Sequence, residues 1–413
     1  MSDSTSLAVW LAAQRQVQQC VVRPISLAES SQWSWVEGRI QHHTGRYFSV
    51  VGVEDADTGW SAPLLEQREI GTLAFIRREH EGEVQLLLQA KLEPGDLGLS
   101  QIAPSVQATA SNLDRVHGGA AQPFAELVTT AADTHVDALG SEQGSRFLGK
   151  FNRNVLVTAD LASAELPSNL RWFSIRELSR LLHQDHAINT DARSVLVSSP
   201  WALLSVVEPF SQGGNAWSRA LNESYRLIRP DELAKAKELV ASMRTSHEPQ
   251  VVSLEELPGW SVDLDGLITV KGGPYCVRQV KIETNAREVG AWDQPIIDTA
   301  EAVTIDLAVC IEEGIVYFGP AAVVEPGLVN RAEWGHSVGL QGDGKVLASV
   351  AQSDEGGRFF QDVANYRLVL VKDLPAGSHL TWLTLGELQS LLAEGGWLTN
   401  EARSALSLLL YWI

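Results

Sequence analysis

Residues 89–119 gather side chains suited to acid and base chemistry into a stretch with almost no aliphatic periodicity. The stretch reads QAKLEPGDLGLSQIAPSVQATASNLDRVHGG and supplies amides, hydroxyls, a lysine, a glutamate and a histidine. Buried amides and hydroxyls raise the free energy of the folded chain unless each is hydrogen-bonded, so packing alone does not explain this composition. A surface loop whose Asn and Ser side chains bond their own backbone is the competing interpretation. The composition favours a site for binding or proton transfer.

The same series of short motifs occurs twice along the chain, in the same order. WSAPLLE at Trp60 and WDQPIID at Trp292 are 232 residues apart, as are the EPG triplets at Glu93 and Glu325. SEQGSRF and SDEGGRF are 212 residues apart, and WFSIRELSRLL and WLTLGELQSLL are 210 residues apart. Ordered self-similarity of this kind marks a duplicated module. The sequence predicts two diverged copies, residues 1–196 and 243–413, joined by a linker over 197–242.

Polar residues kept in only one copy are the stronger functional candidates, because both copies must fold but only one needs to do chemistry. Three side chains of the first copy are replaced in the second by Ala, Val and Gly, namely Gln89, Lys91 and Gln107. The first copy also holds 20 residues that the second lacks, within or just after TASNLDRVHGGAAQPFAEL. Long ordered loops are usually functional. We therefore expect the site in the first copy, beside this insertion.

Strand and helix patterns place these residues on an α+β fold. Segments rich in β-branched and aromatic residues and bounded by Gly or acidic turns predict strands, over 46–53, 70–78, 83–91 and 153–160. Each copy then closes with a predicted helix. Its start is marked by a capping box, Ser174 to Glu177 in the first copy and Thr384 to Glu387 in the second. A mostly β module with covering helices belongs to the α+β class.

Two further local features are predicted. The Pro-Gly pair after Glu93 and after Glu325 suits the central positions of a type II turn. In the linker, residues 230–244 predict a helix that packs on both modules or on a second subunit. The apolar residues spaced for one face of this helix are Leu233, Ala236, Leu239 and Val240.

Composition excludes several classes of partner. A net charge of -19 argues against nucleic acid and anionic membranes, because the field of the protein repels phosphates. Cys20, Cys276 and Cys310 are scattered, form no disulfide framework and fit a reducing cytoplasm. No basic leader precedes the first apolar run, and no segment approaches the ~20 apolar residues that span a bilayer. We expect a soluble cytoplasmic protein.

Other groups lack the spacing of a metal or nucleophile site. His42 and His43 are adjacent, so in a strand they point to opposite faces and cannot hold one metal; we expect them at an edge or in solvent. His183 and His186 have helical spacing but no third ligand nearby. The chain has neither a G-x-S-x-G elbow nor a glycine-rich phosphate loop. No metal site is predicted.

Four segments resemble the signature blocks of the NDP-hexose 2,3-dehydratases, enzymes of deoxysugar biosynthesis. They are WSAPLLEQREIGTLAF, the stretch over 89–119, SEQGSRFLGKFNRNVLV and REVGAWDQPII. The resemblance implies two Nudix-like modules per subunit, a homodimer, and neither a metal nor a redox cofactor. Since no Nudix box is present, pyrophosphate hydrolysis is not implied.

The resemblance also implies the reaction. The substrate would be an NDP-4-keto-6-deoxy-hexose, usually linked to thymidine diphosphate. Its C4 ketone acidifies the hydrogen on C3, the C2 hydroxyl leaves as water, and the enol becomes a 3,4-diketo sugar for a downstream 3-ketoreductase. The protein must supply a base, an acid, a donor to the C4 oxygen and cations for the diphosphate. A sugar-nucleotide-binding protein without turnover is the alternative, and a Mg²⁺-dependent Nudix hydrolase is a third possibility.

Candidate site residues follow from the resemblance. Lys91 and Arg153 would meet phosphates, and His117 or Glu142 would move protons. The amides and hydroxyls that would hold sugar or base are Gln89, Gln107, Ser111 and Asn112. The full catalytic set is His117, Glu142, Lys91 and Gln89. The full binding set is Trp60, Glu93, Gln107, Thr109, Ser111, Asn112, Arg115, Gln143, Lys150, Arg153, Arg287, Trp292 and Gln294.

Three members of the binding set come from the second copy. Arg287 aligns with Asp55 and so has no basic counterpart, and with Trp292 and Gln294 it could mark a second nucleotide pocket. Trp60 and Trp292 hold matching positions. Each of them could stack on a nucleobase, although core packing explains such a pair equally well.

Overall fold

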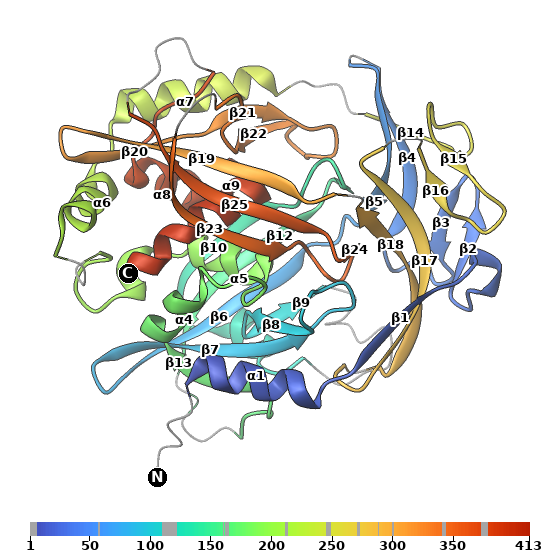
Figure 1. Ribbon diagram of the computed structural model, residues 1–413, viewed down its shortest axis with the longest axis horizontal. Coiled ribbons are helices and arrows are strands. Elements are labelled where there is room, and N and C mark those ends of the chain that lie inside the picture. Colours follow the sequence, from blue (N-terminus) through green and yellow to red (C-terminus); the bar gives the residue numbers. More distant parts are fainter. Residues whose placement is uncertain are drawn as a thin grey trace.

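The computed structural model has β-sheets in layers around two central helices (Figure 1). It describes residues 6–56, 58–109, 122–159, 161, 165–210, 214–244, 249–270, 273–287, 289–299, 301–340, 344–372 and 379–413. The α+β class predicted from the sequence is confirmed. Below, the first half denotes residues up to 196 and the second half residues from 243.

A mixed sheet forms the main layer of the first half. Its strands follow the order β10 (Asp133–Ser141), β12 (Phe151–Thr158), β6 (Gly71–His80), β7 (Glu83–Leu92) and β13 (Leu170–Ser174). β8 (Ser100–Ala103) pairs with β7, and β9 (Val106–Ala108) pairs with β6. β12 and β6 run parallel, whereas the other neighbours are antiparallel. The strands predicted over 70–78, 83–91 and 153–160 are confirmed as β6, β7 and β12, and the strand predicted over 46–53 is confirmed as β4, described below. The predicted ends differ from the observed ends by at most three residues.

The second half has a smaller mixed sheet, which also has a pair of parallel strands at its centre. Its order is β20 (Ile315–Gly319), β19 (Val303–Glu312), β25 (Val363–Leu370) and β23 (Lys345–Ser353). β19 and β25 run parallel, like β6 and β12. A separate hairpin joins β21 (Ala321–Val324) to β22 (Ala332–Gly335).

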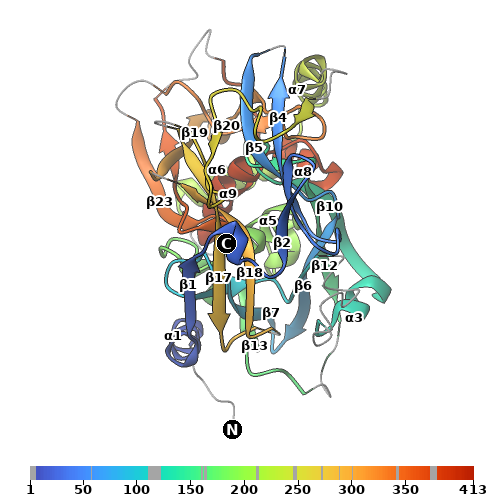
Figure 2. The ribbon, with the colours of Figure 1, turned by 90° about the vertical axis from the view of Figure 1, so that its right-hand side faces the viewer.

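Two further sheets each take one strand from the other half of the chain. The first contains β11 (Phe147–Leu148), β5 (Trp60–Glu66), β4 (Ser49–Asp55), β3 (Arg39–His42) and β2 (Trp33–Val36). The second contains β15 (Ser261–Val262), β16 (Ile268–Thr269), β17 (Tyr275–Thr284), β18 (Ala291–Thr299) and β24 (Phe359–Phe360). β14 (Gln250–Val252) pairs with β4 (Figure 1). β1 (Cys20–Pro24) pairs with β17, as Figure 2 shows. The halves therefore exchange strands.

Helices cover these sheets and fill the space between them. They are α1 (Leu7–Val17), α3 (Ala125–Thr130), α4 (Ile175–Leu181), α5 (Thr190–Ser198), α6 (Ala216–Arg226), α7 (Pro230–Met243), α8 (Leu385–Glu394) and α9 (Asn400–Ser407). Both predicted capping boxes are present, at the starts of α4 and α8. Within the described ranges, no helix is both long and apolar enough to cross a membrane.

Helices α5 and α9 pack against each other at the centre, between the two mixed sheets (Figure 1). The hydroxyl of Thr190 donates to Oδ1 of Asn400 at 3.1 Å, so the first residues of the two helices meet. Arg193 and Arg403 are buried at matching positions and donate to Oγ of Ser407 and of Ser194. One apolar core extends through both halves around this pair.

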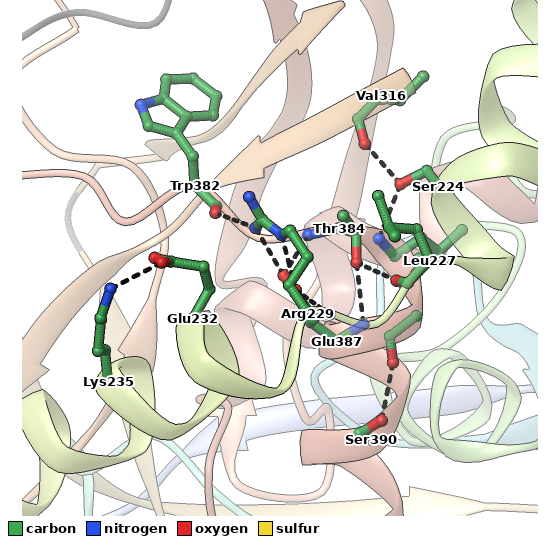
Figure 3. Close-up of polar contacts among 12 residues, drawn as sticks. Ser224, Leu227, Arg229, Glu232, Lys235, Val316, Trp382, Thr384, Glu387 and Ser390 are labelled. Carbon is green, nitrogen blue, oxygen red and sulfur yellow. Dashed lines mark hydrogen bonds and ion pairs between the residues drawn. The ribbon is translucent and has the colours of Figure 1, made fainter. Parts of the chain in front are cut away.

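The linker contacts both halves. Arg77 of β6 donates to the Leu203 carbonyl at 2.8 Å. Arg229 donates from Nε and Nη2 to the two carboxylate oxygens of Glu387, each at 2.8 Å, at the start of α8 (Figure 3). Glu387 is fully buried and also closes the capping box with Thr384. The predicted linker helix is confirmed as α7, but Leu239 is 45% exposed and does not belong to its buried face.

The two EPG triplets form turns that cross the backbone of the opposite half. The amide of Gly95 donates to the Gly356 carbonyl at 2.7 Å, and the amide of Gly327 donates to the Gly144 carbonyl at 2.8 Å. A turn is confirmed at each triplet, but the type II prediction is wrong, because neither glycine has the positive φ that this turn requires. The glycines serve close approach instead. A Cβ on Gly95 would lie 1.6 Å from the carbonyl oxygen of Phe359.

Gly95→Ala is expected to destabilise the fold by at least about 2 kcal/mol, because the new methyl group has to displace backbone of the other half. The matched control is Gly290→Ala, where the Cβ would meet its nearest atom at 3.5 Å, an ordinary contact at an exposed position. Its effect should stay within about 0.5 kcal/mol. Urea unfolding monitored by tryptophan fluorescence measures both. Equal midpoints for Gly95→Ala and the wild type would contradict the packing argument.

Candidate functional site

A cavity of about 390 Å³ lies where the two halves meet. The first half contributes residues of β3, β7 and β9 and the first turn of α5, and the second half contributes the β17–β18 hairpin and residues 355–358. The two backbone segments that cross where Gly95 meets Gly356 both reach the wall of the cavity, one through Pro94 and the other through Gly357. The volume is in the range of small-molecule sites. The cavity therefore takes side chains from both halves.

Cationic side chains converge on this cavity although the protein as a whole is acidic. Nζ of Lys91 lies 3.2 Å from Oε1 of Glu93. The Arg287 guanidinium donates to the Leu92 carbonyl at 3.0 Å, and Lys150 donates to the Glu69 carbonyl at 2.7 Å. Burial lowers the pKa of Lys150. Cations gathered in a partly desolvated cleft attract an anionic ligand.

Arg358 adds a further positive charge from the second half. It donates from Nε to Oε1 of Gln67 at 3.2 Å, and its guanidinium lies 4.3 Å from the ring centroid of Phe48. Burial lowers the pKa of Arg358, although Glu355 and Glu93 oppose the shift. The stacking fixes the plane of the guanidinium, so its donors have a defined direction.

Carboxyl groups share the cavity with these cations. Burial alone would raise the pKa of Glu93, but the attraction of Lys91 and Arg287 lowers it. Burial raises the pKa of Asp191 well above its usual value, and neighbouring carboxylates, first Glu355, add to the shift. Burial also raises the pKa of Glu355, although Arg358 opposes the shift. Groups with opposed shifts in one cavity are typical of proton-transfer sites.

Amide side chains link this charged region to helix α5. Gln107 donates to Oε1 of Glu93 at 3.2 Å and accepts from Nδ2 of Asn189 at 3.0 Å. Asn189 is also the N-cap of α5, whose second residue is Asp191. The helix start and the polar end of β9 are therefore held in one hydrogen-bonded unit.

An aromatic wall closes another side of the cavity. Trp292 donates from Nε1 to Oε1 of Gln294 at 2.9 Å, and Gln294 donates to the Gly357 carbonyl at 2.8 Å. The ring of His42 lies 4.4 Å from that of Tyr47. His42 is buried, so the prediction of an edge or solvent position is wrong for this residue, whereas His43 is exposed as predicted; both line the cavity. His43 lies in the turn after β3, where strand alternation no longer applies.

Eight of the predicted site residues line this single cavity. They are Lys91, Glu93, Gln107, Thr109, Lys150, Arg287, Trp292 and Gln294. The three residues that could have marked a second nucleotide pocket, Arg287, Trp292 and Gln294, therefore lie with Lys91 and not in a separate pocket. Four other predicted residues fall outside the described part of the chain, namely Ser111, Asn112, Arg115 and His117.

The remaining predicted residues lie outside the cavity lining. Gln89 and Gln143 are buried, and Oε1 of each lacks a hydrogen-bond partner among the described residues. Trp60 packs into the core beside β4, and Arg153 forms an ion pair with Asp137 in which both side chains are more than a third exposed. Glu142 is buried one layer behind the cavity.

Glu142 is held by amide donors from both halves. Asn152, which lines the cavity, donates to its Oε1 at 2.7 Å, and Asn400 of α9 donates to its Oε2 at 2.8 Å. Burial raises the pKa of Glu142 to about 7, and the carboxylate of Glu355 adds to the shift. Glu142 can orient Asn152 but has no surface in the cavity itself.

Sequence reasoning missed Asp191, Glu355 and Arg358. Asp191 lies in no polar motif. Glu355 aligns with Gln143, so one copy has a carboxyl where the other has an amide, and this difference was a usable signal. Among the residues that the structure describes, no group of three or more His, Cys, Asp or Glu side chains is arranged to hold a metal ion.

Comparison with known proteins gives a consistent result. The family model described as NDP-hexose 2,3-dehydratase matches residues 4–198, 238–344 and 333–409. A protein of Saccharopolyspora spinosa named dTDP-4-dehydro-6-deoxy-alpha-D-glucopyranose 2,3-dehydratase is 29% identical, over 98% of this chain and 91% of its own length. Proteins of the same name from Streptomyces violaceoruber and Amycolatopsis orientalis are 28% and 27% identical, over 98% and 96% of this chain and 97% and 88% of their own lengths.

Asn400→Leu is expected to destabilise the protein more at high pH than at low pH. The pKa of Glu142, about 7, exceeds its ordinary value of 4.5, so the stability that this group contributes is present below the ordinary value and is lost as the pH rises through 7. Removing a donor to the carboxylate raises this pKa further. The loss of this hydrogen bond raises the free energy of the folded protein by about 1–3 kcal/mol when Glu142 is ionised.

Urea unfolding at about pH 5.5 and at about pH 8.5 measures this difference. The matched control is Asn365→Leu at a half-buried position of β25, which should show the same effect at both values. A destabilisation by Asn400→Leu that does not change with pH would contradict the assigned hydrogen bond.

Proposed function

The chain belongs to the NDP-hexose 2,3-dehydratase family, and from this premise we propose that it removes water across C2 and C3 of a dTDP-linked 4-keto-6-deoxy-hexose. The product is a 3,4-diketo-2,6-dideoxy sugar nucleotide. The observation that carries the proposal is the meeting of Lys91, Arg287 and Arg358 with buried carboxyl groups in one cavity. This sugar nucleotide presents a diphosphate and a hexose ring with a reactive C4 ketone, and the cavity has groups suited to each.

The chemistry makes limited demands on the protein. The C4 ketone accepts the electrons released when the C3 proton is removed, and the same electrons then expel the C2 hydroxyl. Carbon is neither oxidised nor reduced overall, since the sum of the steps is loss of water. The protein has to bind the diphosphate, stabilise charge on the C4 oxygen and transfer protons.

We assign the diphosphate to Lys91, Arg287 and Arg358, because these cations line the cavity from both halves. We assign Trp292 to the nucleobase, and Gln107 and Thr109 to the sugar, because all three line the same cavity. Glu142 acts as a positioning residue through Asn152. Arg153 has no place in this assignment, because it faces Asp137 outside the cavity.

The segment with Ser111, Asn112, Arg115 and His117 stays in the proposed site. The structure describes the chain up to Thr109 and again from Gln122, and both of these residues line the cavity. This supports a contribution from the residues between them. His117 remains a candidate for proton transfer on this basis.

The wider assignments rest on the resemblance and on matched contacts. Tandem duplication of a Nudix-like module is supported by paired features of the halves, such as β11 parallel to β5 and β24 parallel to β18 at matching residues. A homodimer in the cytoplasm is expected for this family. A 3-ketoreductase would consume the product, because the new C3 ketone is the group that such an enzyme reduces.

The reaction can be tested directly. The purified protein is incubated with dTDP-4-keto-6-deoxyglucose, a reagent specific for adjacent diketones is added, and the product is weighed by mass spectrometry. Loss of one water from the sugar supports the proposed function. Binding of the substrate without loss of water supports the non-catalytic binding protein instead, and release of dTMP would indicate a Nudix hydrolase.

Lys91→Ala and Arg287→Ala should each lower kcat/KM by roughly 10- to 100-fold, the effect of losing a hydrogen bond to a charged group. The loss should appear mainly in KM, since the diphosphate stays remote from the reacting carbons. The matched control is Lys345→Ala, an exposed lysine at the start of β23, which should leave kinetics unchanged. An unchanged KM in both cavity variants would contradict the assignment of the diphosphate to Lys91 and Arg287.

A further inference from the structure

Two carboxyl groups in the cavity lack the partners that their neighbours have. Glu93 is bonded to Lys91 and Gln107, and Asp293 accepts from Ser31. By contrast, no described residue donates a hydrogen bond to the carboxylate of Asp191, which is only 4% exposed, and Oε2 of Glu355 is buried without a partner. Buried carboxyl oxygens are rarely left unbonded unless a ligand or a proton completes them.

Asp191 and Glu355 come from different halves of the chain. Asp191 is the second residue of α5, where the N-cap Asn189 and Gln107 hold the helix start. Glu355 lies between β23 and β24, next to the Gly95–Gly356 crossing. Both line the cavity. Side-chain hydrogen bonds of Asn189 thus fix the helix start that carries Asp191, and a backbone hydrogen bond fixes the segment that carries Glu355.

The duplicated module keeps a carboxyl at the position of Asp191 but not at the position of Glu355. At the position that matches Glu355, the first half has Gln143, whose amide is buried and makes no hydrogen bond among the described residues. The counterpart of Asp191 is Glu401 on α9, which does not line the cavity. Of the two matching positions, 143 and 355, only the one that lines this cavity has a carboxyl group.

The surrounding charges favour different protonation states for the two groups. Burial and Glu93 raise the pKa of Glu355, whereas the nearby cations Arg358, Lys150 and Lys91 favour its ionised form. Burial raises the pKa of Asp191, the nearby carboxylates of Glu355, Glu142 and Glu93 add to the shift, and Lys91 opposes it. The carboxylate of Glu355 thus favours the protonated form of Asp191, whereas three cations favour the ionised form of Glu355.

We propose that Glu355 and Asp191 are the proton-transfer pair of the dehydration, a role that rests on the proposed function of this cavity. The Glu355 carboxylate takes the proton from C3, and the C3–H electrons form a double bond to C4 with negative charge on its oxygen. As the C4 ketone re-forms, a C2–C3 double bond appears and the C2–O bond breaks. The Asp191 carboxyl gives its proton to the leaving hydroxyl, which departs as water.

The tautomerisation that follows restores the pair. Glu355 now carries a proton and Asp191 is ionised. Asp191 takes the proton from the C3 hydroxyl of the enol, and Glu355 gives its proton to C2. The products are the 3,4-diketone and water, and both carboxyls are back in their starting states. No other reactant is needed.

Exchange at C3 separates the two roles. Glu355→Gln and Asp191→Asn are incubated with dTDP-4-keto-6-deoxyglucose in D₂O, and the sugar is followed by NMR and mass. Glu355→Gln should lose both deuterium uptake at C3 and water elimination, by about 10²- to 10⁴-fold, the usual effect of a general acid or base. Asp191→Asn should lose elimination to a similar extent while it still exchanges the C3 hydrogen.

Controls distinguish failure of this pair from failure of the proposed function. Binding of dTDP, measured by calorimetry, shows that each variant is folded, and Glu401→Gln on α9 is the matched variant that should keep full turnover. If the wild type eliminates water and Glu355→Gln does so at the same rate, the pair is overturned. The assignment is also overturned if Asp191→Asn loses C3 exchange while Glu355→Gln retains it. If the wild type never eliminates water, the proposed function itself has failed.

Discussion

The crossing of two glycine turns is the constraint on which the rest of the molecule depends. At Gly95 the backbone of one half approaches the Phe359 carbonyl so closely that no side chain fits, and Gly327 meets Phe147 of the other half in the same way. Hydrogen bonds to Gly356 and Gly144 lock both crossings. Because Glu93 directly precedes one crossing and Arg358 directly follows it, this contact brings charges from distant parts of the chain to one wall.

Burying charged groups around the cavity raises the free energy of the folded protein. Desolvation disfavours every ionised group there, and the shifted pKa values of Lys150 and Asp191 record that cost. Opposite charges offset part of it, as in the contact between Lys91 and Glu93. At the position matching Arg287, the other half has Asp55, which forms a buried ion pair with Arg331 at 2.6 Å. Asp55 is thus neutralised by an ion pair between the two halves, whereas Arg287 lines the cavity.

Local signals in the sequence were sufficient for the elements and for part of the site. Strand composition and capping boxes depend on neighbouring residues, and Lys91 and Gln107 stood out because the second copy lacks them. Arg358 did not stand out, because Arg146 occupies its matching position. The two arginines have different environments: Arg146 stacks on Tyr275, whereas Arg358 lines the cavity. Such differences arise from long-range packing, which spacing along the chain does not record.

The exchange of β1 and β14 bears on how the chain is made. β1 leaves the ribosome early, but its partner β17 is synthesised roughly 250 residues later, which at typical elongation rates takes on the order of ten to fifty seconds. During that time the nascent first half also lacks β14 at the edge of β4. Two strand edges stay open until β14 and β17 have been synthesised. Transient protection by a chaperone would matter most in this interval, since open edges are where nascent chains aggregate.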